Sequence, residues 1–228
     1  MRRILAFVFA AALTTPVNAF ALGERAWLQI SGGGGNYAMG DINRDASAYN
    51  QANPGAAGFN LIKNGASFGG SVGFETPSHW NFGVSIDRML ADTKVSDASG
   101  AADYQFHAYA IRGFGEYSLR PIGSSSLRIG AGVGMVAENG DLVESTPGNA
   151  PQKFKIGGSG PLYEGYAGGD LWLGPTFAIV GTGGYRYART NSVTIAGGTL
   201  ITSNGEADKA DYSGVFFRVG IKLAAPEN

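Results

Sequence analysis

Apolar and polar residues alternate with a period of two along several stretches of this chain. Between Leu127 and Met135, every odd-numbered residue is apolar, whereas the even-numbered ones are Arg128 and three glycines. Residues two apart point to the same side of a β-strand. This stretch is therefore predicted to be a strand with one apolar face and one face of glycine and charge.

Eight strands with this alternation are predicted, at 25–35, 66–76, 80–91, 104–120, 126–138, 161–173, 176–190 and 210–223. Their connections are short at 77–79, 121–125 and 174–175, and long at 36–65, 92–103, 139–160 and 191–209. Short turns on one side and long loops on the other are typical of outer-membrane barrels. We therefore expect an all-β fold, a closed up-and-down antiparallel eight-stranded transmembrane β-barrel with short periplasmic turns and long extracellular loops.

The strand registers follow from the short turns, because like faces must pair. A turn centred on Ser78 pairs Phe74 with Phe82 and Val72 with Val84. A turn centred on Ile122 pairs Tyr117 with Leu127, and one centred on Pro175 pairs Tyr163 with Tyr187. On the opposite face, these registers place Glu116 across from Arg128 and Glu164 across from Arg186.

A set of charged residues shares the face opposite the apolar one. A charge on the lipid side costs about 2–4 kcal/mol near the bilayer centre, so these side chains are predicted to point into the barrel. Eight strands enclose a space that side chains fill, and buried charges there need partners. The predicted lumenal charge network contains five acids and four arginines: Glu75, Asp87, Arg112, Glu116, Arg128, Glu164, Asp170, Arg186 and Arg218.

The N-terminus has the pattern of an export signal. Arg2 and Arg3 precede an apolar run at 4–13, and small residues end at Ala19 and at Ala21. A charged start, a short apolar core and small residues before the cut define a cleaved signal peptide. We assign 1–21 to the signal peptide and 22–228 to the barrel, with cleavage after Ala19 as the alternative.

Composition narrows the class further. Hydrophobic residues make up 44% of the chain, too many for a disordered protein, and the 37 glycines have no period of three. The formal net charge of −1 gives no indication of nucleic-acid binding. There is no cysteine, so neither disulfides nor thiolate metal sites are expected.

With these features, the chain resembles the small eight-stranded bacterial outer-membrane β-barrels, a family that includes the transmembrane domain of outer-membrane protein A, opacity proteins and adhesion barrels. Tyr212, Gly214, Phe217 and Val219 match the family's C-terminal assembly signal, although the family usually ends on phenylalanine and this strand continues to Leu223. The resemblance implies a Gram-negative outer membrane. It also implies outer-membrane lipid, lipopolysaccharide and the barrel-assembly machinery as partners.

Aromatic residues flank the first short turn. Phe74, Trp80, Phe82 and Tyr117 are predicted to form the aromatic girdle at the periplasmic interface. Trp27 and Trp172 fall on the inner face, where packing against glycine is favoured over a dedicated plug.

Candidate chemistry is sparse, and no catalytic, cofactor or metal site is expected. His79 is predicted to face solvent in a turn, and His107 lies at the rim without a serine at the spacing of a hydrolase dyad. The segment 41–47 begins like a calcium loop but lacks the glycine at position six and the glutamate at position twelve. A loop helix is predicted there instead, with Asp41 as its N-cap and with Ile42 and Tyr49 on one face.

The pattern favours a structural and surface-interaction barrel that is not an enzyme. Its long loops would meet extracellular ligands, and Arg88 and Lys94 would meet lipopolysaccharide phosphates. The alternative is a narrow channel for ions or a small solute, gated by the Glu116–Arg128 and Glu164–Arg186 pairs. A third hypothesis is a soluble periplasmic lipid-binding barrel with its two faces reversed.

Overall fold

The computed structural model describes residues 25–226 except 56, 98–99, 120–124 and 202–204; the expected signal peptide at 1–21 lies outside this range. Eight strands form the body of the fold: β1 Arg25–Asn36, β2 Asn64–Glu75, β3 Trp80–Asp97, β4 Gly100–Leu119, β5 Ser125–Ser145, β6 Gln152–Trp172, β7 Phe177–Ala188 and β10 Gly214–Ala224. Helix α2 (Gly40–Ala52) and a small hairpin of β8 (Thr194–Ile195) and β9 (Gly198–Thr199) lie in the connections.

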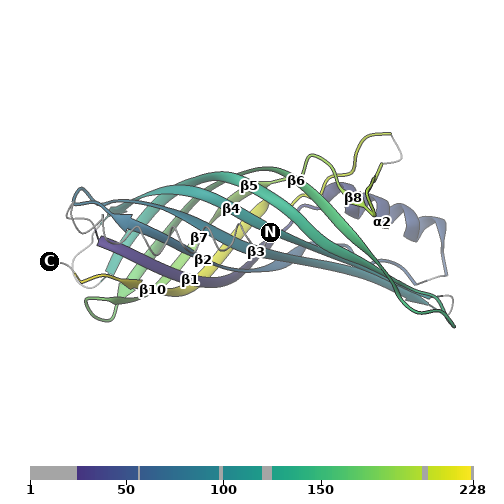
Figure 1. Cartoon of the computed structure of the whole chain (residues 1–228), viewed down its shortest axis with the longest axis horizontal. Helices are drawn as coiled ribbons and strands as arrows, with labels where there is room; N and C mark the ends of the chain where they lie inside the picture. Colours follow the sequence, from purple (N-terminus) through teal and green to yellow (C-terminus); the bar gives the residue numbers. More distant parts are fainter. Residues whose placement is uncertain (1–24, 56, 98–99, 120–124, 202–204, 227–228) are drawn as a thin grey trace.

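The eight strands form a closed antiparallel ring (Figure 1). Each pairs with its neighbour in the chain, β7 pairs with β10, and β10 pairs with β1. The predicted fold class is therefore confirmed. Within the described part of the chain, no helix combines the length and the apolar character needed to cross a membrane.

Two of the three predicted registers are confirmed. Phe74 pairs with Phe82, and Tyr163 pairs with Tyr187. The β4–β5 register is wrong by two residues, since Tyr117 faces Ile129 instead of Leu127. The turn is centred one residue later than expected, and a shift of two leaves every side chain on its predicted face.

Strands β3 to β6 are 18 to 21 residues long, whereas β1, β2, β7 and β10 have 11 or 12. The long loops predicted at 92–103 and 139–160 are thus largely wrong, because most of these residues continue the strands. Figure 1 shows β3, β4 and β5 running past the ring at the end where α2 lies. The regular run of large apolar outward positions ends at Met135 on β5, and a mixture of small, polar and apolar residues follows it (Ala137, Asn139, Asp141, Val143), so the sequence signal disappears.

The outer surface of the ring is apolar and exposed. Ile129, Val133 and Phe217 are each about 60% exposed, at 60%, 60% and 62%. The intervening residues of the same strands point inward, and Arg128 and Arg218 are buried among them. An exposed apolar belt around a sealed charged interior suits lipid and is opposite to a soluble lipid-binding barrel.

Matched substitutions on β5 test this assignment. Ala131 and Ala137 both point outward, but Ala131 lies within the apolar belt and Ala137 lies beyond Met135. We expect Ala131→Arg to lower the free energy of unfolding by about 2–4 kcal/mol and Ala137→Arg by about 0–1 kcal/mol. Urea unfolding in lipid vesicles measures both, and equal costs would contradict the membrane position of the belt.

Candidate functional site

The centre of the lumen is organised around Glu164 of β6. Its carboxylate lies 2.7 Å from Arg186 Nε, 2.9 Å from Arg218 Nη2 and 3.0 Å from Arg112 Nε. These arginines come from β7, β10 and β4, and the glutamate side chain is fully buried. One carboxylate therefore ties three other strands together, with Asp87 of β3 as a second acceptor for Arg112 and for Arg218, at 3.1 Å from the latter.

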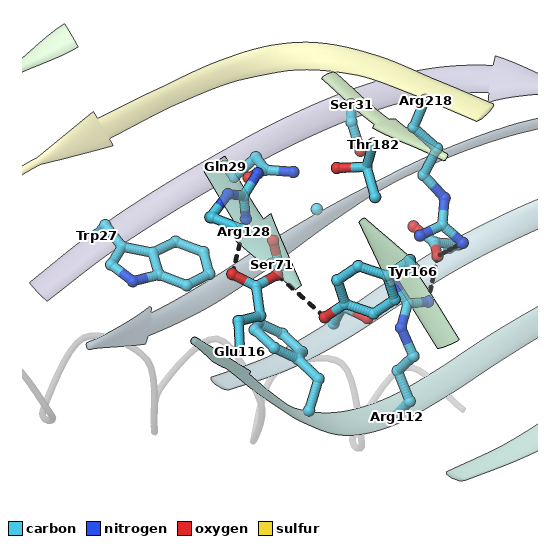
Figure 2. A pocket seen from close by; sticks show the side chains of 14 residues that line it. Trp27, Gln29, Ser31, Ser71, Arg112, Glu116, Arg128, Tyr166, Thr182 and Arg218 are labelled. Carbon is cyan, nitrogen blue, oxygen red and sulfur yellow. Dashed lines mark hydrogen bonds and ion pairs between the residues drawn. The ribbon is translucent and has the colours of Figure 1, made fainter. Parts of the chain in front are cut away.

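A second group of charges lies nearer the short turns. Arg128 Nη1 is 2.7 Å from Glu116 Oε2, and its Nη2 is 2.9 Å from Asp170 Oδ1. The Tyr166 hydroxyl donates to Glu116 Oε1 at 3.0 Å, and Figure 2 shows this bond beside the Arg128 pair. Lys222 Nζ completes the group at 3.2 Å from Asp170 Oδ2.

All nine residues of the predicted lumenal network are buried on the inner face. Glu116 and Arg128 are not directly opposite, as the predicted register placed them, but they meet diagonally. Glu75 lies across from Arg25 at the short-turn end. Sequence reasoning left Lys222 out of the set, although its position four residues after Arg218 in an alternating strand placed it on the same face.

The aromatic residues near the short turns lie on both the outer and the inner face of the barrel. Trp80 lies 6.1 Å from Phe82 and 5.3 Å from Tyr117 between ring centroids, on the outer face with Phe74. Trp27 is buried inside, with Lys222 Nζ 4.6 Å from its ring centroid. The outer four have the arrangement of an interfacial girdle, and Trp27 packs within the lumen.

The lower lumen, which is the part nearer the short turns, contains a small cavity of about 30 Å³, shown in Figure 2. Charged and hydroxyl side chains line it, among them Arg112, Arg128, Arg218, Ser71 and Ser85. A space of this size holds about two water molecules. The cavity therefore lies among the buried charged side chains of the lumen.

The upper lumen, which is the part nearer α2 and the long connections, is filled mainly by apolar side chains. Tyr37, Met39 and Ile62 from the β1–β2 connection and Val193 from the β7–β10 connection pack against barrel residues in one buried cluster with Phe106 and Leu162. These loop residues fold inward and cover the charged layer. The lumen thus has a lower layer of ion pairs and an upper layer that we call the apolar plug.

Helix α2 follows directly from this plug. It begins at Gly40, and Met39 is the N-cap with left-handed backbone angles and no side-chain hydrogen bond. The predicted N-cap at Asp41 is therefore wrong, because the buried Met39 side chain fixes the start of the helix. Asp41 instead pairs with Arg44 at 3.2 Å and with Arg189 at 3.3 Å, which links the helix to the β7–β10 connection.

A buried carboxyl group lies against the plug, above the apolar belt. The Tyr212 hydroxyl donates to Glu138 Oε2, and Tyr37 lies 5.3 Å from Tyr212 between ring centroids. Burial raises the pKa of Glu138 to about 8 from 4.5, while hydrogen bonds from Tyr212 and the His107 backbone oppose the rise. Near neutral pH this carboxyl is therefore mainly protonated.

The residues of the predicted assembly signal lie at the start of the last strand. Phe217 and Val219 point outward from β10, which begins at Gly214. Tyr212 precedes the strand and is buried in the plug. Recognition of these residues during assembly stays a prediction.

The ring nitrogens of His107 both have partners. Nδ1 lies 3.3 Å from Arg88 Nη2, and Nε2 lies 3.1 Å from Asp92 Oδ1. Among the described residues, no serine hydroxyl has a hydrogen bond to this histidine, and no group of three or more His, Asp or Glu side chains could hold a metal ion. His107 therefore has the surroundings of a surface charge network.

The convergence on Glu164 predicts a large effect of its removal. Glu164→Gln keeps the shape but leaves three buried arginines short of charge, so we expect a loss of about 3–5 kcal/mol in the free energy of unfolding. The matched control is Asp141→Asn, which loses pairs to the exposed Lys153 and Lys155 and should cost about 0–1 kcal/mol. Urea unfolding followed by heat-modifiable migration measures both, and similar costs would refute the central role of Glu164.

Glu138 predicts a pH dependence of stability. Its pKa is higher in the folded barrel, about 8, than the ordinary 4.5, so its contribution is complete below pH 4.5 and is lost as pH rises to 8. We expect wild type to lose stability relative to Glu138→Gln across this window and the difference to level off above it. Unfolding midpoints of both proteins between pH 4 and 9 (~0.5 steps) measure this, and parallel profiles would contradict it.

Comparison with known proteins gives structural similarity only. No family model matches the chain, and no curated protein matches it. The chain is similar to neisserial surface protein A, with 11% identity, 88% of this chain and 96% of that chain covered, and a TM-score of 0.45. It is also similar to Ail of Yersinia pestis, solved with the heparin analogue sucrose octasulfate, at 14% identity, 89% and 99% coverage and a TM-score of 0.44.

One of the similar structures is that of an enzyme. Outer membrane protease OmpT from Escherichia coli overlaps 89% of this chain and 96% of its own, at 8% identity and a TM-score of 0.43. The closed strand ring of the chain itself, with its apolar outer belt, establishes the barrel fold.

Proposed function

We propose that this chain is an outer-membrane barrel of a Gram-negative bacterium with a structural and surface-interaction role, exported by a signal peptide at 1–21. The observation that carries the proposal is a lumen filled in two layers below a projecting strand extension. A filled interior leaves the outer wall and the long-loop end as the surfaces available to partners.

The filled lumen supports this role over a narrow channel. A solute would have to displace the apolar plug, in which Met39 and Val193 are completely buried, and then the ion pairs around Glu164. Separating those ion pairs without replacement partners costs several kcal/mol per buried charge. A cavity of about 30 Å³ lies among these ion pairs.

The partner that best suits the outer wall is lipopolysaccharide. Beyond the apolar belt, from Arg88 near its edge to Lys153 and Lys155 farther along the strand extensions, β3 to β6 carry outward charges that we call the rim cluster: Arg88, Asp92, Lys94, Asp103, His107, Asp141, Lys153 and Lys155. Lys153 and Lys155 both pair with Asp141, at 3.0 and 2.6 Å. Their side chains remain 57% and 70% exposed, so two cations share one carboxylate and retain capacity for phosphate.

The remaining rim residues extend this surface toward β3. Arg88 stacks over Tyr109 with its guanidinium carbon 5.9 Å from the ring centroid and also contacts His107. Cations outside an apolar belt face the phosphate-bearing headgroups of the lipid, with Arg88 nearest the belt and Lys153 and Lys155 farther out. The mixture of lysine, arginine and aspartate therefore favours a phosphorylated lipid headgroup, with divalent cations available to bridge the carboxylates.

Assembly would use the last strand. In the closed ring, β10 pairs with β1 on one side and β7 on the other, so it is the strand that completes the barrel. Its outward Phe217 and Val219 are exposed to lipid. These positions support recognition by the barrel-assembly machinery before closure.

Two double variants test the proposed lipid contact. Lys153→Ala with Lys155→Ala removes two cations from the rim cluster, and Lys63→Ala with Lys209→Ala removes two cations from elsewhere at the same end. We expect the first to weaken retention of purified lipopolysaccharide by about 2 kcal/mol, since each basic residue near an anionic surface contributes ~1 kcal/mol.

The readout is lipopolysaccharide bound per folded barrel across a salt series. The control variant should bind as wild type does, because its lysines lie outside the rim cluster. Equal retention by the two double variants would contradict a specific role of the rim.

A further inference from the structure

Helix α2 meets the β7–β10 connection through more acidic than basic side chains. Figure 1 shows the connection beside the helix, and an ion pair between Arg189 and Asp41 joins the two. The group at this contact contains four aspartates and two arginines: Asp41, Arg44, Asp45, Arg189, Asp208 and Asp211. Two guanidinium groups therefore face four carboxylates.

The two arginines pair with three of the four aspartates. Arg44 lies 3.2 Å from Asp41 and 3.8 Å from Asp45. Arg189 lies 3.3 Å from Asp41 and 3.7 Å from Asp211. Both arginine side chains are partly exposed, and ion pairs in contact with solvent contribute little. Neither arginine is thus available to neutralise the fourth carboxylate.

Asp208 is this fourth carboxylate, and it is buried. The residue is 1% exposed, and among the described residues its Oδ1 atom has no hydrogen-bond partner. Its neighbour on α2 is another carboxylate, because Asp45 lies in hydrogen-bonding contact with it. Ionised carboxylates only accept hydrogen bonds, so two of them in contact need a proton or a cation between them.

The backbone around Asp208 holds the side chain in this position. Val193 N donates to Asp208 O at 2.7 Å, and Asp208 N donates to Leu200 O at 3.0 Å. Asp41 and Asp45 lie one helical turn apart, so they share the face of α2 that meets the connection. The segment that begins like a calcium loop in the sequence thus presents its aspartates from a helix, toward a buried carboxylate of another segment.

We propose that Asp208 and Asp45 bind one divalent cation of the calcium class, which joins α2 to the β7–β10 connection. Calcium prefers oxygen ligands, of which it takes about six to eight, and water molecules complete the coordination around the two carboxylates. The cation supplies positive charge that two arginines do not provide to four aspartates. Because only two carboxylates bind it, the expected Kd is about 10⁻⁴–10⁻³ M, as in extracellular calcium modules.

Such a cation would hold the cover of the barrel in place. Val193, whose backbone is bonded to Asp208, is completely buried in the apolar plug, and α2 begins directly after Met39 of the same plug. Joining the helix to the connection therefore ties the two loop segments that fill the upper lumen. This inference is independent of the proposed lipid contact, and it is tested without lipopolysaccharide.

Calcium binding is measured by isothermal titration calorimetry on the full barrel, purified free of lipopolysaccharide. The assay is run at about pH 8, since burial and the facing carboxylates raise the pKa of Asp208 to about 6. Wild type should bind calcium with saturation. Asp208→Asn should weaken binding by more than about tenfold, because loss of even an outer-shell partner costs a metal site about that much.

The matched control is Asp103→Asn, which removes a carboxylate of the rim cluster and should bind calcium as wild type does. Asp45→Asn is a second test variant, placed on the more exposed helix side of the contact, and it should lose binding even if Asp208→Asn fails to fold. Wild type without saturable binding would overturn the proposal and assign a shared proton to the two carboxylates. Binding retained by Asp45→Asn would also overturn it.

Hydrogen exchange of α2 provides a second readout. Saturating calcium should slow exchange of the amides at 40–52, and at ten times its Kd the detached fraction of the helix should fall about elevenfold. Strand β4 is the internal reference and should be unaffected. In Asp208→Asn the side-chain amide can donate to Asp45, so the helix should be protected without calcium dependence. Calcium binding that leaves exchange of α2 unchanged in wild type would overturn the proposal.

Discussion

Closure of the backbone between β1 and β10 is the constraint on which this structure depends. Within a bilayer, no water is available for an open strand edge, so each unpaired backbone group would cost several kcal/mol. The nine paired positions from Trp27 to Gly35 close the ring and remove its last free edges. Because the sheet closes into a barrel, one face of every strand is enclosed and the other faces outward.

Closing eight strands creates an interior that must be filled, and this chain fills it in two ways. The lower layer uses long charged side chains that reach across the barrel, with Glu164 joining arginines from three strands. The upper layer uses loop side chains such as Met39 and Ile62. Ion pairs fix which strands meet, because each guanidinium needs a particular carboxylate, whereas the plug excludes water from above.

The alternation of apolar and polar residues was sufficient to predict the strands and their inward and outward faces. It was insufficient to predict the strand ends and the packing of the long connections. The apolar face, the inward position of Arg128 and the β6–β7 register follow from a period of two and a two-residue turn. The β4–β5 register required the true centre of a longer turn. The extensions of β3 to β6 were not predicted, because the apolar alternation ends where the outer face meets water. The burial of Met39 was not predicted either, because it depends on tertiary packing that no local pattern encodes.

The unequal strand lengths have a consequence for how the molecule meets its neighbours. Since β3 to β6 rise beyond the ring while β1, β2, β7 and β10 stop at it, the barrel has a tall side and a low side. A cylinder of uniform height has no preferred heading within the plane of a membrane. This barrel presents a taller wall on one side than on the other, so a neighbouring lipid or protein meets a different surface depending on the side from which it approaches.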